Sequence, residues 1–222
     1  MASNANVRGG RRKVRNRIEE GSDSSRRQQI LDAARACFTE RGLRQTTIRH
    51  IAEKAGMSVG HIYNSFSSKE EIVEAMTRAH AETFTKMLFE DLGADRDDRT
   101  KCEMHFRRML DRILDSESAY LMVSFLNEAL TNERICSLMS SLMIEFKDQI
   151  MEMRGPKCSH ISSEVLEARI MFMMSLFQGL RCIAFFFPKH DKALLKQVAI
   201  ERLMQWVDAD NAERQRLTQS KS

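Results

Sequence analysis

The sequence predicts an all-α protein. Pro occurs only 2 times and Gly 9 times in 222 residues, whereas the helix-forming residues Leu, Met, Ala, Arg, Glu and Lys are abundant. Apolar residues recur at helical spacing, and no alternating pattern of convincing strand length is present. A chain of this length buries a substantial core, as one large domain or as two small ones.

The first helix is predicted over residues 25–41. Its apolar residues fall at i, i+3, i+4, i+7 and i+8, the one-sided stripe of an amphipathic helix, and Gly42 is placed as its C-terminal cap. Residues 1–24 have no apolar periodicity and are rich in Arg, Asn, Ser and Gly. We therefore expect a disordered basic tail before the first helix.

Two short helices follow, separated by a sharp turn. Thr46 or Thr47 offers an N-cap for a helix of little over two turns that ends at Gly56. Gly56 is free to take the left-handed conformation that a sharp reversal needs. Ser58 then caps a shorter helix that ends near Phe66. The arrangement predicted for residues 25–72 is a helix-turn-helix domain.

A long fourth helix is predicted to begin after Ser68. The run Ser68-Lys69-Glu70-Glu71 has the pattern of a capping box, in which Ser68 bonds the amide of Glu71 and Glu71 bonds back. This helix ends near Gly93 and is followed by a charged loop.

The remaining sequence predicts a second helical domain over residues 73–210. Helices are expected at 101–115, 118–131, 133–153, 162–187 and 191–209, with breaks at Gly155-Pro156 and Pro188. Residues 211–222 are expected to be a second disordered tail.

The charges are segregated along the chain. Residues 1–69 contain 14 Lys and Arg against 6 Asp and Glu, whereas residues 70–222 contain 21 against 25. A basic end on a mildly acidic body is typical of a protein that binds a polyanion through one end. The alternative is that the basic residues before position 18 are simply a solvated tail.

The third helix carries an unusual outer face. After its apolar stripe of Val59, Ile62 and Phe66, the remaining positions hold short or polar residues: Gly60, His61, Asn64 and Ser65. A merely solvated face would favour Glu and Lys, and a mid-helix Gly costs about 1 kcal/mol relative to Ala. One helix fits the major groove of B-DNA, where its side chains contact base edges. The alternative is a plain corner in a helical bundle.

Residues 26–76 resemble the DNA-binding domain of the tetracycline-repressor family of bacterial transcription regulators. The motifs are F-x-E-x-G-x-x-x-T-T from Phe38, I-A-E-K-A-G-M-S from Ile51, I-Y-x-x-F from Ile62 and S-K-E-E from Ser68. The resemblance covers about a quarter of the chain. It implies an N-terminal three-helix DNA-binding domain, joined through a long fourth helix to a helical ligand-binding and dimerisation domain.

The resemblance also implies roles for matching residues. Thr47, Arg49, Tyr63 and Lys69 would hold phosphates, Arg49 with access to a base edge, while His61 differs from the residues usual in the family. Helix N-termini add free amides for phosphate oxygens. The predicted DNA-binding residues are Thr46, Thr47, Arg49, Ser58, Val59, Gly60, His61, Tyr63, Asn64 and Lys69.

The second domain is rich in adaptable apolar residues, with 13 of the 15 methionines after residue 75. They would form core and dimer interface, or a pocket for a lipophilic or aromatic ligand. The candidate ligand-binding residues are Met104, Phe125, Met139, Met143, Met173 and Phe177. The resemblance implies a homodimer through residues 162–209, in which ligand binding moves the fourth helix. Gly179 would permit close helix approach or leave a packing gap.

No pattern for catalysis or for a metal is evident. Cys102-x-x-His105 has no second pair of ligands at suitable spacing, and no phosphate-binding glycine loop occurs. The 5 cysteines are odd in number, widely spread and without a CxxC pair, which favours reduced thiols in a cytoplasmic protein. We expect no enzyme activity, no cofactor, no metal and no membrane partner.

These observations predict a homodimeric repressor of a neighbouring gene. It would bind a palindromic site in double-stranded DNA and be released by a small-molecule effector. Two alternatives stay open at this point. One is a DNA-bound protein of the same fold that acts through a protein partner, as the division-blocking members of the family do. The other is a helical ligand carrier or enzyme in which the helix-turn-helix is only a corner.

Overall fold

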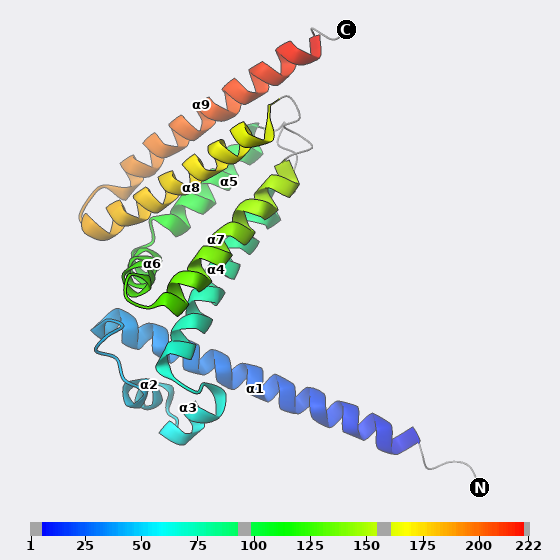
Figure 1. Cartoon of the computed structure of the whole chain (residues 1–222), viewed down its shortest axis with the longest axis vertical. Coiled ribbons are helices and arrows are strands. Elements are labelled where there is room, and N and C mark those ends of the chain that lie inside the picture. The colour runs from blue at the N-terminus through cyan, green and yellow to red at the C-terminus, as the bar shows by residue number, and fades with distance from the viewer. Residues whose placement is uncertain (1–5, 93–98, 155–160, 220–222) are drawn as a thin grey trace. The chain divides into compact units, whose positions relative to one another are not determined.

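The computed structural model describes residues 6–92, 99–154 and 161–219 of the chain, and in these ranges it contains helices but no strand (Figure 1). The all-α prediction is therefore confirmed. In chain order the helices are α1 (Asn6–Arg41), α2 (Ile48–Ala55), α3 (Val59–Ser65), α4 (Lys69–Leu92), α5 (Arg99–Ile113), α6 (Ser116–Ala129), α7 (Glu133–Arg154), α8 (Ser163–Phe186) and α9 (Lys192–Gln219).

The chain divides into two compact units, Met1–Met76 and Thr77–Ser222. Helix α4 begins in the first unit and continues without a break into the second. The division lies four residues after the boundary expected from the sequence, within one turn of the same helix.

The N-terminal unit is organised around one face of α1. That face contributes Ile30, Ala34 and Phe38, which are fully buried, and α2 and α3 cover it. The residues buried from the two short helices are Ile51, Ala52, Ala55 and Ile62, followed by Phe66. Two helices of 8 and 7 residues are too short to be stable alone, so this burial holds them in place.

The turn between α2 and α3 has the predicted construction. Gly56 caps α2 with φ of 65° and ψ of 31°, in the left-handed region that residues with a Cβ rarely adopt. Ser58 caps α3, and its side chain accepts a hydrogen bond from the backbone N–H of His61. The reversal between the two helices thus takes only three residues.

The loop before α2 corrects one prediction. Thr46 is buried, and its hydroxyl donates to the carbonyls of Cys37 at 3.1 Å and Gly42 at 2.9 Å. Thr47 is the N-cap of α2 and is exposed. Thr46 therefore ties the loop to α1 and cannot reach a phosphate, because its side chain is enclosed by protein.

The start of α4 also differs in detail from the predicted capping box. The Ser68 hydroxyl accepts the backbone N–H of Glu71 at 3.2 Å, as expected. The Glu71 carboxylate, however, accepts from the backbone N–H of Ser67 at 2.7 Å and from its hydroxyl at 2.8 Å. The reciprocal bond therefore goes to the residue before the expected one.

Both ends of the chain are more helical than the sequence predicted. Helix α1 begins at Asn6 rather than near residue 25, and α9 continues to Gln219 rather than ending near 209. Apolar periodicity is a criterion for packed helices, and these extensions lack it. Both extensions contain Arg and Glu residues, which have a high intrinsic helix propensity.

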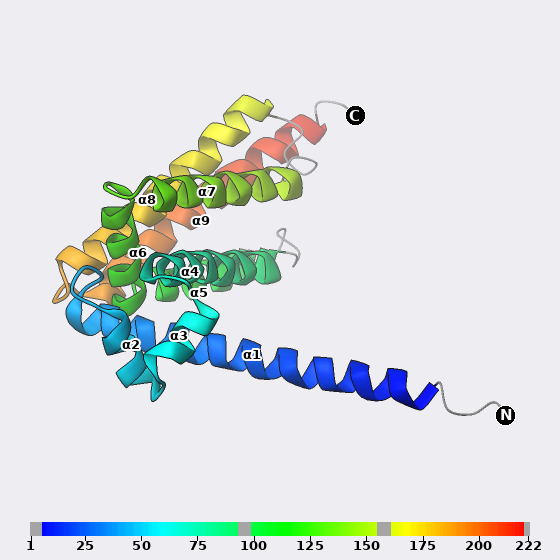
Figure 2. The same ribbon diagram turned by 60° about the horizontal axis from the view of Figure 1, so that its bottom comes forward.

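The C-terminal unit is a bundle whose core lies between α5, α8 and α9. The buried core residues include Met109, Leu110, Ile113, Ala184, Leu203 and Met204. Helix α9 packs along α5, while α6 packs on α7 and α8 and runs crosswise to α7 (Figure 2). The predicted helices of this unit are confirmed to within about two residues at most ends, and the predicted break at Gly155-Pro156 lies outside the described residues.

The described cysteines Cys37, Cys102, Cys136 and Cys182 are free thiols, and Cys158 lies outside the described residues. Burial raises the pKa of the Cys37 thiol above its ordinary value, with a smaller contribution from Glu40. A protonated, enclosed thiol is a poor nucleophile, which is consistent with a structural role for Cys37.

The Thr46 hydroxyl offers a test of the loop. Replacing Thr46 by Val keeps the shape of the side chain and removes both hydrogen bonds, so the free energy of unfolding should fall by about 1 kcal/mol. The matched control is Thr39→Val, whose hydroxyl is exposed on α1 and should change stability by less than about 0.5 kcal/mol. Equal thermal shifts for the two variants would show that the buried hydroxyl does not hold the loop.

Candidate nucleic-acid interface

Helix α3 presents one buried and one exposed side. Ile62 is fully buried against α1, whereas Val59, Gly60, His61, Tyr63 and Asn64 are exposed. The structure therefore brings these five predicted site residues together on one short helix. A Cβ added at Gly60 would approach only the Ser58 hydroxyl, at 3.8 Å, so no packing within the chain requires a glycine there.

The His61 side chain is oriented by the cap of α3. Its Nδ1 lies 2.9 Å from the Ser58 hydroxyl oxygen, which also accepts the backbone N–H of His61 at 3.2 Å. Because that oxygen already accepts one proton, its own proton can go to Nδ1 of a neutral ring. This arrangement leaves the Nε2–H of His61 as the outward donor.

The N-terminus of α2 is a closed capping box. Thr47 accepts the backbone N–H of His50 at 3.3 Å, and the His50 Nδ1 accepts the backbone N–H of Thr47 at 3.3 Å. His50 had no evident partner in the sequence, because His rarely occupies this position of the box. The Thr47 hydroxyl keeps its proton for an external acceptor, and Arg49 is exposed in the first turn of the helix.

Lys69, a predicted phosphate ligand, has a second role. Its ammonium donates to the backbone carbonyl of Leu43 at 3.1 Å, which ties the start of α4 to the loop between α1 and α2. An ammonium has three donors, so this bond leaves others for a phosphate.

Two residues of α1 that the sequence analysis did not single out fix α2 and α3. The Arg27 guanidinium donates to the carbonyl of Ser65 at 2.6 Å and lies 3.9 Å above the Phe66 ring. Gln29 donates to the carbonyl of Ala55 at 2.9 Å. Each side chain thereby satisfies a carbonyl at the end of a short helix. No local pattern identifies such bonds, since their partners are 38 and 26 residues away.

Glu71 is the acidic residue at the start of α4, and its charge is compensated. The backbone N–H of Ser67, then its hydroxyl, hold the pKa of the Glu71 carboxyl below its ordinary value, with a smaller contribution from Arg27. The Arg27 guanidinium lies 3.6 Å from this carboxylate. The carboxylate is therefore ionised at neutral pH but is surrounded by donors, which reduces its repulsion of an approaching anion.

The second unit contains an apolar cavity of about 100 Å³. It is lined from α4, α6, α7 and α8, and four of the predicted ligand-binding residues lie on its wall: Phe125, Met139, Met143 and Phe177. The other two are not on this wall, because Met104 is exposed on α5 and Met173 packs against the main core. Helical periodicity shows which side of a helix is apolar, but not which apolar side faces a void.

The cavity wall also includes polar residues, which the abundance of Met and Phe in the sequence did not indicate. Thr77 and His80 of α4 and Gln178 and Arg181 of α8 line it beside the apolar side chains. His80 packs edge-on against Phe125, with ring centroids 6.2 Å apart. Arg181 stands on α8 one turn after Phe177, so the spacing could have indicated that both face the same space.

Helices α8 and α9 lie side by side (Figure 1), and several apolar side chains of both are exposed. Phe172 of α8 is 59% exposed and contacts Trp206 of α9, with ring centroids 5.4 Å apart. The other exposed apolar residues of the two helices include Val165, Ile183, Phe186, Leu194 and Val198. Gly179 is exposed among them, and nothing within 4 Å would meet a Cβ there.

Among the described helices, α8 alone has the length and composition that would allow it to cross a membrane. Its arginines limit that possibility. Arg169 bonds Asp210 of α9 at 3.0 Å, and Arg181 lies above the Phe84 ring at 4.6 Å. The exposed apolar surface of α8 is therefore interrupted by polar positions that contact other helices of the same unit.

No group of three or more potential metal ligands occurs in the residues that the structure describes. Cys102 and His105, which the sequence analysis considered as half of a metal site, are buried in α5.

Comparison with known proteins identifies relatives of the N-terminal unit. Residues 30–76 match the family model described as bacterial regulatory proteins, tetR family. The HTH-type transcriptional repressor KstR2 of Mycobacterium tuberculosis is 50% identical over 58 residues, which are 26% of this chain and 29% of that protein. KstR2 of Rhodococcus jostii is 34% identical over 126 residues, which are 56% of this chain and 61% of that protein. The chain thus aligns with less than two thirds of these relatives.

Solved structures resemble the chain over most of its length. A transcriptional regulator from Pseudomonas aeruginosa has a TM-score of 0.70 at 18% identity and covers 86% of this chain and 94% of its own. The fatty acid degradation regulator FadR from Bacillus halodurans has a TM-score of 0.63 at 20% identity, and the match covers 81% of this chain and 94% of FadR. At these identities the likeness establishes a shared fold.

Proposed function

Because residues 30–76 match the model of the tetR family of bacterial regulatory proteins, we propose that the chain is a member of that family and a homodimeric transcriptional repressor, released from a palindromic operator by a small molecule. The observation that carries the proposal is the outer face of α3. It is exposed, uncharged and rich in hydrogen-bonding groups, and a glycine stands where no packing within the chain demands one.

The outer face of α3 suits the major groove. The His61 Nε2–H is a donor for N7 or O6 of a purine, and the Asn64 amide can bond adenine through both its donor and its acceptor. Gly60 would allow the helix to approach the base edges closely. We assign specificity to His61 and Asn64 because their side chains are exposed and make no hydrogen bond to α1 or α2 within the described residues.

Phosphate contacts would fix α3 in the groove. Thr47 and Arg49 lie at the start of α2, Tyr63 is 53% exposed on α3, and Lys69 lies at the start of α4. The free amides at these helix starts add to the attraction for phosphate oxygens. Such contacts orient a protein on the duplex and carry no sequence information by themselves.

The exposed face of α8 and α9 supports a dimer. A monomer that leaves Phe172 and Trp206 half-exposed together gains by burying them against a second copy. A two-fold dimer would place two α3 helices about 34 Å apart, one turn of B-DNA, and so would require a palindromic site. Open space at Gly179 supports close approach of two α8 helices rather than a gap filled from within the chain.

The cavity supports a small-molecule signal. Its wall includes five residues of α4 between Thr77 and Thr85, and the same helix begins at the proposed phosphate ligand Lys69. A ligand that displaces α4 in the second unit would therefore act on the start of the same helix. A small apolar cavity also favours a small-molecule effector over the alternative of a protein partner.

Selection from a random DNA library tests the proposal. The protein should enrich a palindrome. The logarithm of its association constant should fall as the logarithm of the salt concentration rises, with a slope of about −4, because Arg49 and Lys69 of each subunit together neutralise about four phosphates and each contributes about −0.9. Tyr63→Phe should weaken binding to all sites alike, whereas Asn64→Ala should change which sites are enriched. Failure to enrich any sequence at moderate salt would contradict the repressor proposal.

Gly60 gives effects of opposite sign on stability and binding. Gly60→Ala should raise the free energy of unfolding, by up to about 1 kcal/mol, because Ala favours helix and the added methyl meets no atom closer than 3.8 Å. The same methyl should weaken binding to the selected operator by roughly tenfold, the effect of about 1.4 kcal/mol. A variant that is more stable and binds equally well would show that Gly60 does not approach DNA.

Introducing one charged residue on the exposed apolar face of α8 tests whether that face forms the dimer interface. Phe172→Glu should convert a dimer into a monomer in light scattering coupled to size-exclusion chromatography, because it places a carboxylate at the centre of the apolar face. Ile144→Glu is the control, since Ile144 on α7 is 57% exposed and lies outside α8 and α9. If Phe172→Glu remains dimeric, the interface lies elsewhere.

A further inference from the structure

The cavity of the second unit contains a buried cation. Arg181 is 5% exposed, yet it lines the cavity together with apolar residues from four helices. Its guanidinium makes one hydrogen bond, from Nη1 to the Gln178 side-chain oxygen at 2.6 Å, and its central carbon lies 4.6 Å from the centre of the Phe84 ring. The Nε–H is buried without an acceptor among the described residues.

No described carboxylate pairs with Arg181. Burial, with a smaller contribution from Arg112, lowers the pKa of Arg181 to about 10, and no acidic residue opposes the shift. The side chain therefore still carries its charge at neutral pH. A buried charge without a counterion is costly, and proteins normally pair such a group.

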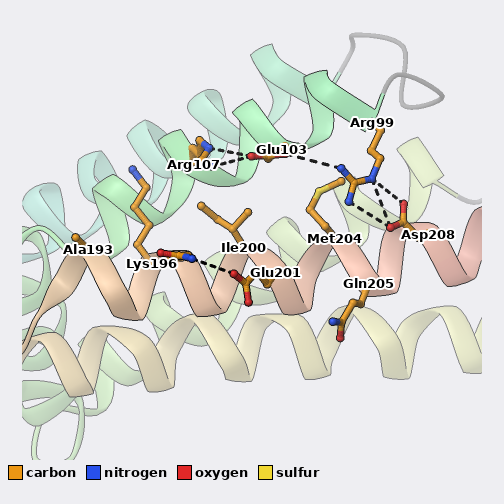
Figure 3. A pocket seen from close by; sticks show the side chains of 11 residues that line it. Arg99, Glu103, Arg107, Ala193, Lys196, Ile200, Glu201, Met204, Gln205 and Asp208 are labelled. Atoms are coloured by element: carbon orange, nitrogen blue, oxygen red, sulfur yellow. Dashed lines mark hydrogen bonds and ion pairs between the residues drawn. The ribbon is translucent and has the colours of Figure 1, made fainter.

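The charged groove between α5 and α9 provides a contrast (Figure 3). It is larger, about 730 Å³, and its lining includes Arg99, Arg107 and Lys196. Each of these cations has a carboxylate partner: Asp208 at 3.2 Å, Glu103 at 2.7 Å and Asp111 at 2.5 Å, respectively. The groove therefore satisfies its own charges, and its size alone indicates no ligand.

We propose that Arg181 is the anchor for the acidic head group of the effector, and that the effector is a small amphipathic carboxylate with an aliphatic or aromatic body. This inference rests on the proposed role of the cavity as the effector site. A carboxylate would supply the missing counterion and bond the free edge of the guanidinium through Nε. The stacking on Phe84 and the bond to Gln178 hold the guanidinium plane ready for it.

The apolar wall suits the body of such a ligand. Four methionines line the cavity, Met122, Met139, Met143 and Met174, and they can change rotamer to admit different shapes. At about 100 Å³ the cavity is smaller than the engineered cavities of about 150 Å³ that hold benzene. Entry of a ligand therefore requires these side chains to move, which links occupancy to the packing of α4 and α8.

Matched pairs of ligands test the proposal by calorimetry on the full chain. The pairs are octanoate with octan-1-ol, and 4-phenylbutyrate with 4-phenylbutan-1-ol, so that only the head group differs. At least one carboxylate should bind about tenfold or more tightly than its alcohol, the usual effect of a hydrogen bond to a charged group. Octylammonium should not bind, because its charge repels Arg181.

Substitutions of Arg181 test whether this residue causes the preference for a carboxylate over its alcohol. Arg181→Met should abolish the tenfold preference while leaving the alcohol unchanged or tighter, and it should fold, because it replaces a buried charge by an apolar side chain of similar length. Arg181→Lys should retain part of the preference, since it keeps the charge and loses the planar fork. Arg107→Met makes the same charge change in the groove and should leave every affinity unchanged.

The outcomes separate this inference from the proposed function. Alcohols that bind as tightly as the carboxylates, an unchanged preference in Arg181→Met, or no binding of either carboxylate would overturn the inference, while operator binding would still stand. Carboxylates that bind through Arg181 but do not release the selected operator would support the anchor and contradict the effector role. Carboxylates that release the operator from the wild type and not from Arg181→Met would support both.

Discussion

The N-terminal unit depends on fixing a helix that cannot be stable alone. Helix α3 has 7 residues, and an isolated helix of that length does not form in water. Burial of Ile62 and Phe66 supplies apolar contact, and Arg27 bonds the last carbonyl of α3 while it stacks on Phe66. Orientation of the exposed face is thus set by side chains of α1 and by backbone groups of α3.

Because α2 and α3 are held through their backbone carbonyls and buried side chains, the exposed side chains of α3 are available for binding. The bonds that hold α2 and α3 use the carbonyls of Ala55 and Ser65, and the bond that ties α4 to the preceding loop uses the carbonyl of Leu43. Each is worth only about 1 kcal/mol, but together they replace the contacts that a longer helix would make with itself. The side chains of His61 and Asn64 make none of these three bonds, so substitutions there should alter binding with little loss of stability.

Most helices and the turn between α2 and α3 could be predicted from the sequence, because caps and apolar stripes depend on residues that are close together in the chain. Gly56 and Ser58 identified the turn, and most helix ends lay within about two residues of the expected positions. The features that the sequence did not predict depend on contacts between residues that are distant in the chain. Thr46 and Thr47 are equivalent by propensity, and only the burial of Thr46 against Cys37 and Gly42 distinguishes them. The same reason explains why the wall of the cavity was only partly predicted.

A comparison of Arg27 with Arg181 shows why the second residue indicates a ligand. Both guanidiniums stack on a phenylalanine ring, at 3.9 Å for Arg27 and 4.6 Å for Arg181. Arg27 in addition bonds a backbone carbonyl and faces the Glu71 carboxylate, so its charge is satisfied within its own unit. Arg181 has the aromatic contact and one amide oxygen, but no carboxylate among the described residues. Stacking orients a guanidinium but does not neutralise its charge. The Arg181 guanidinium is therefore held in a defined orientation, while its charge has no counterion among the described residues.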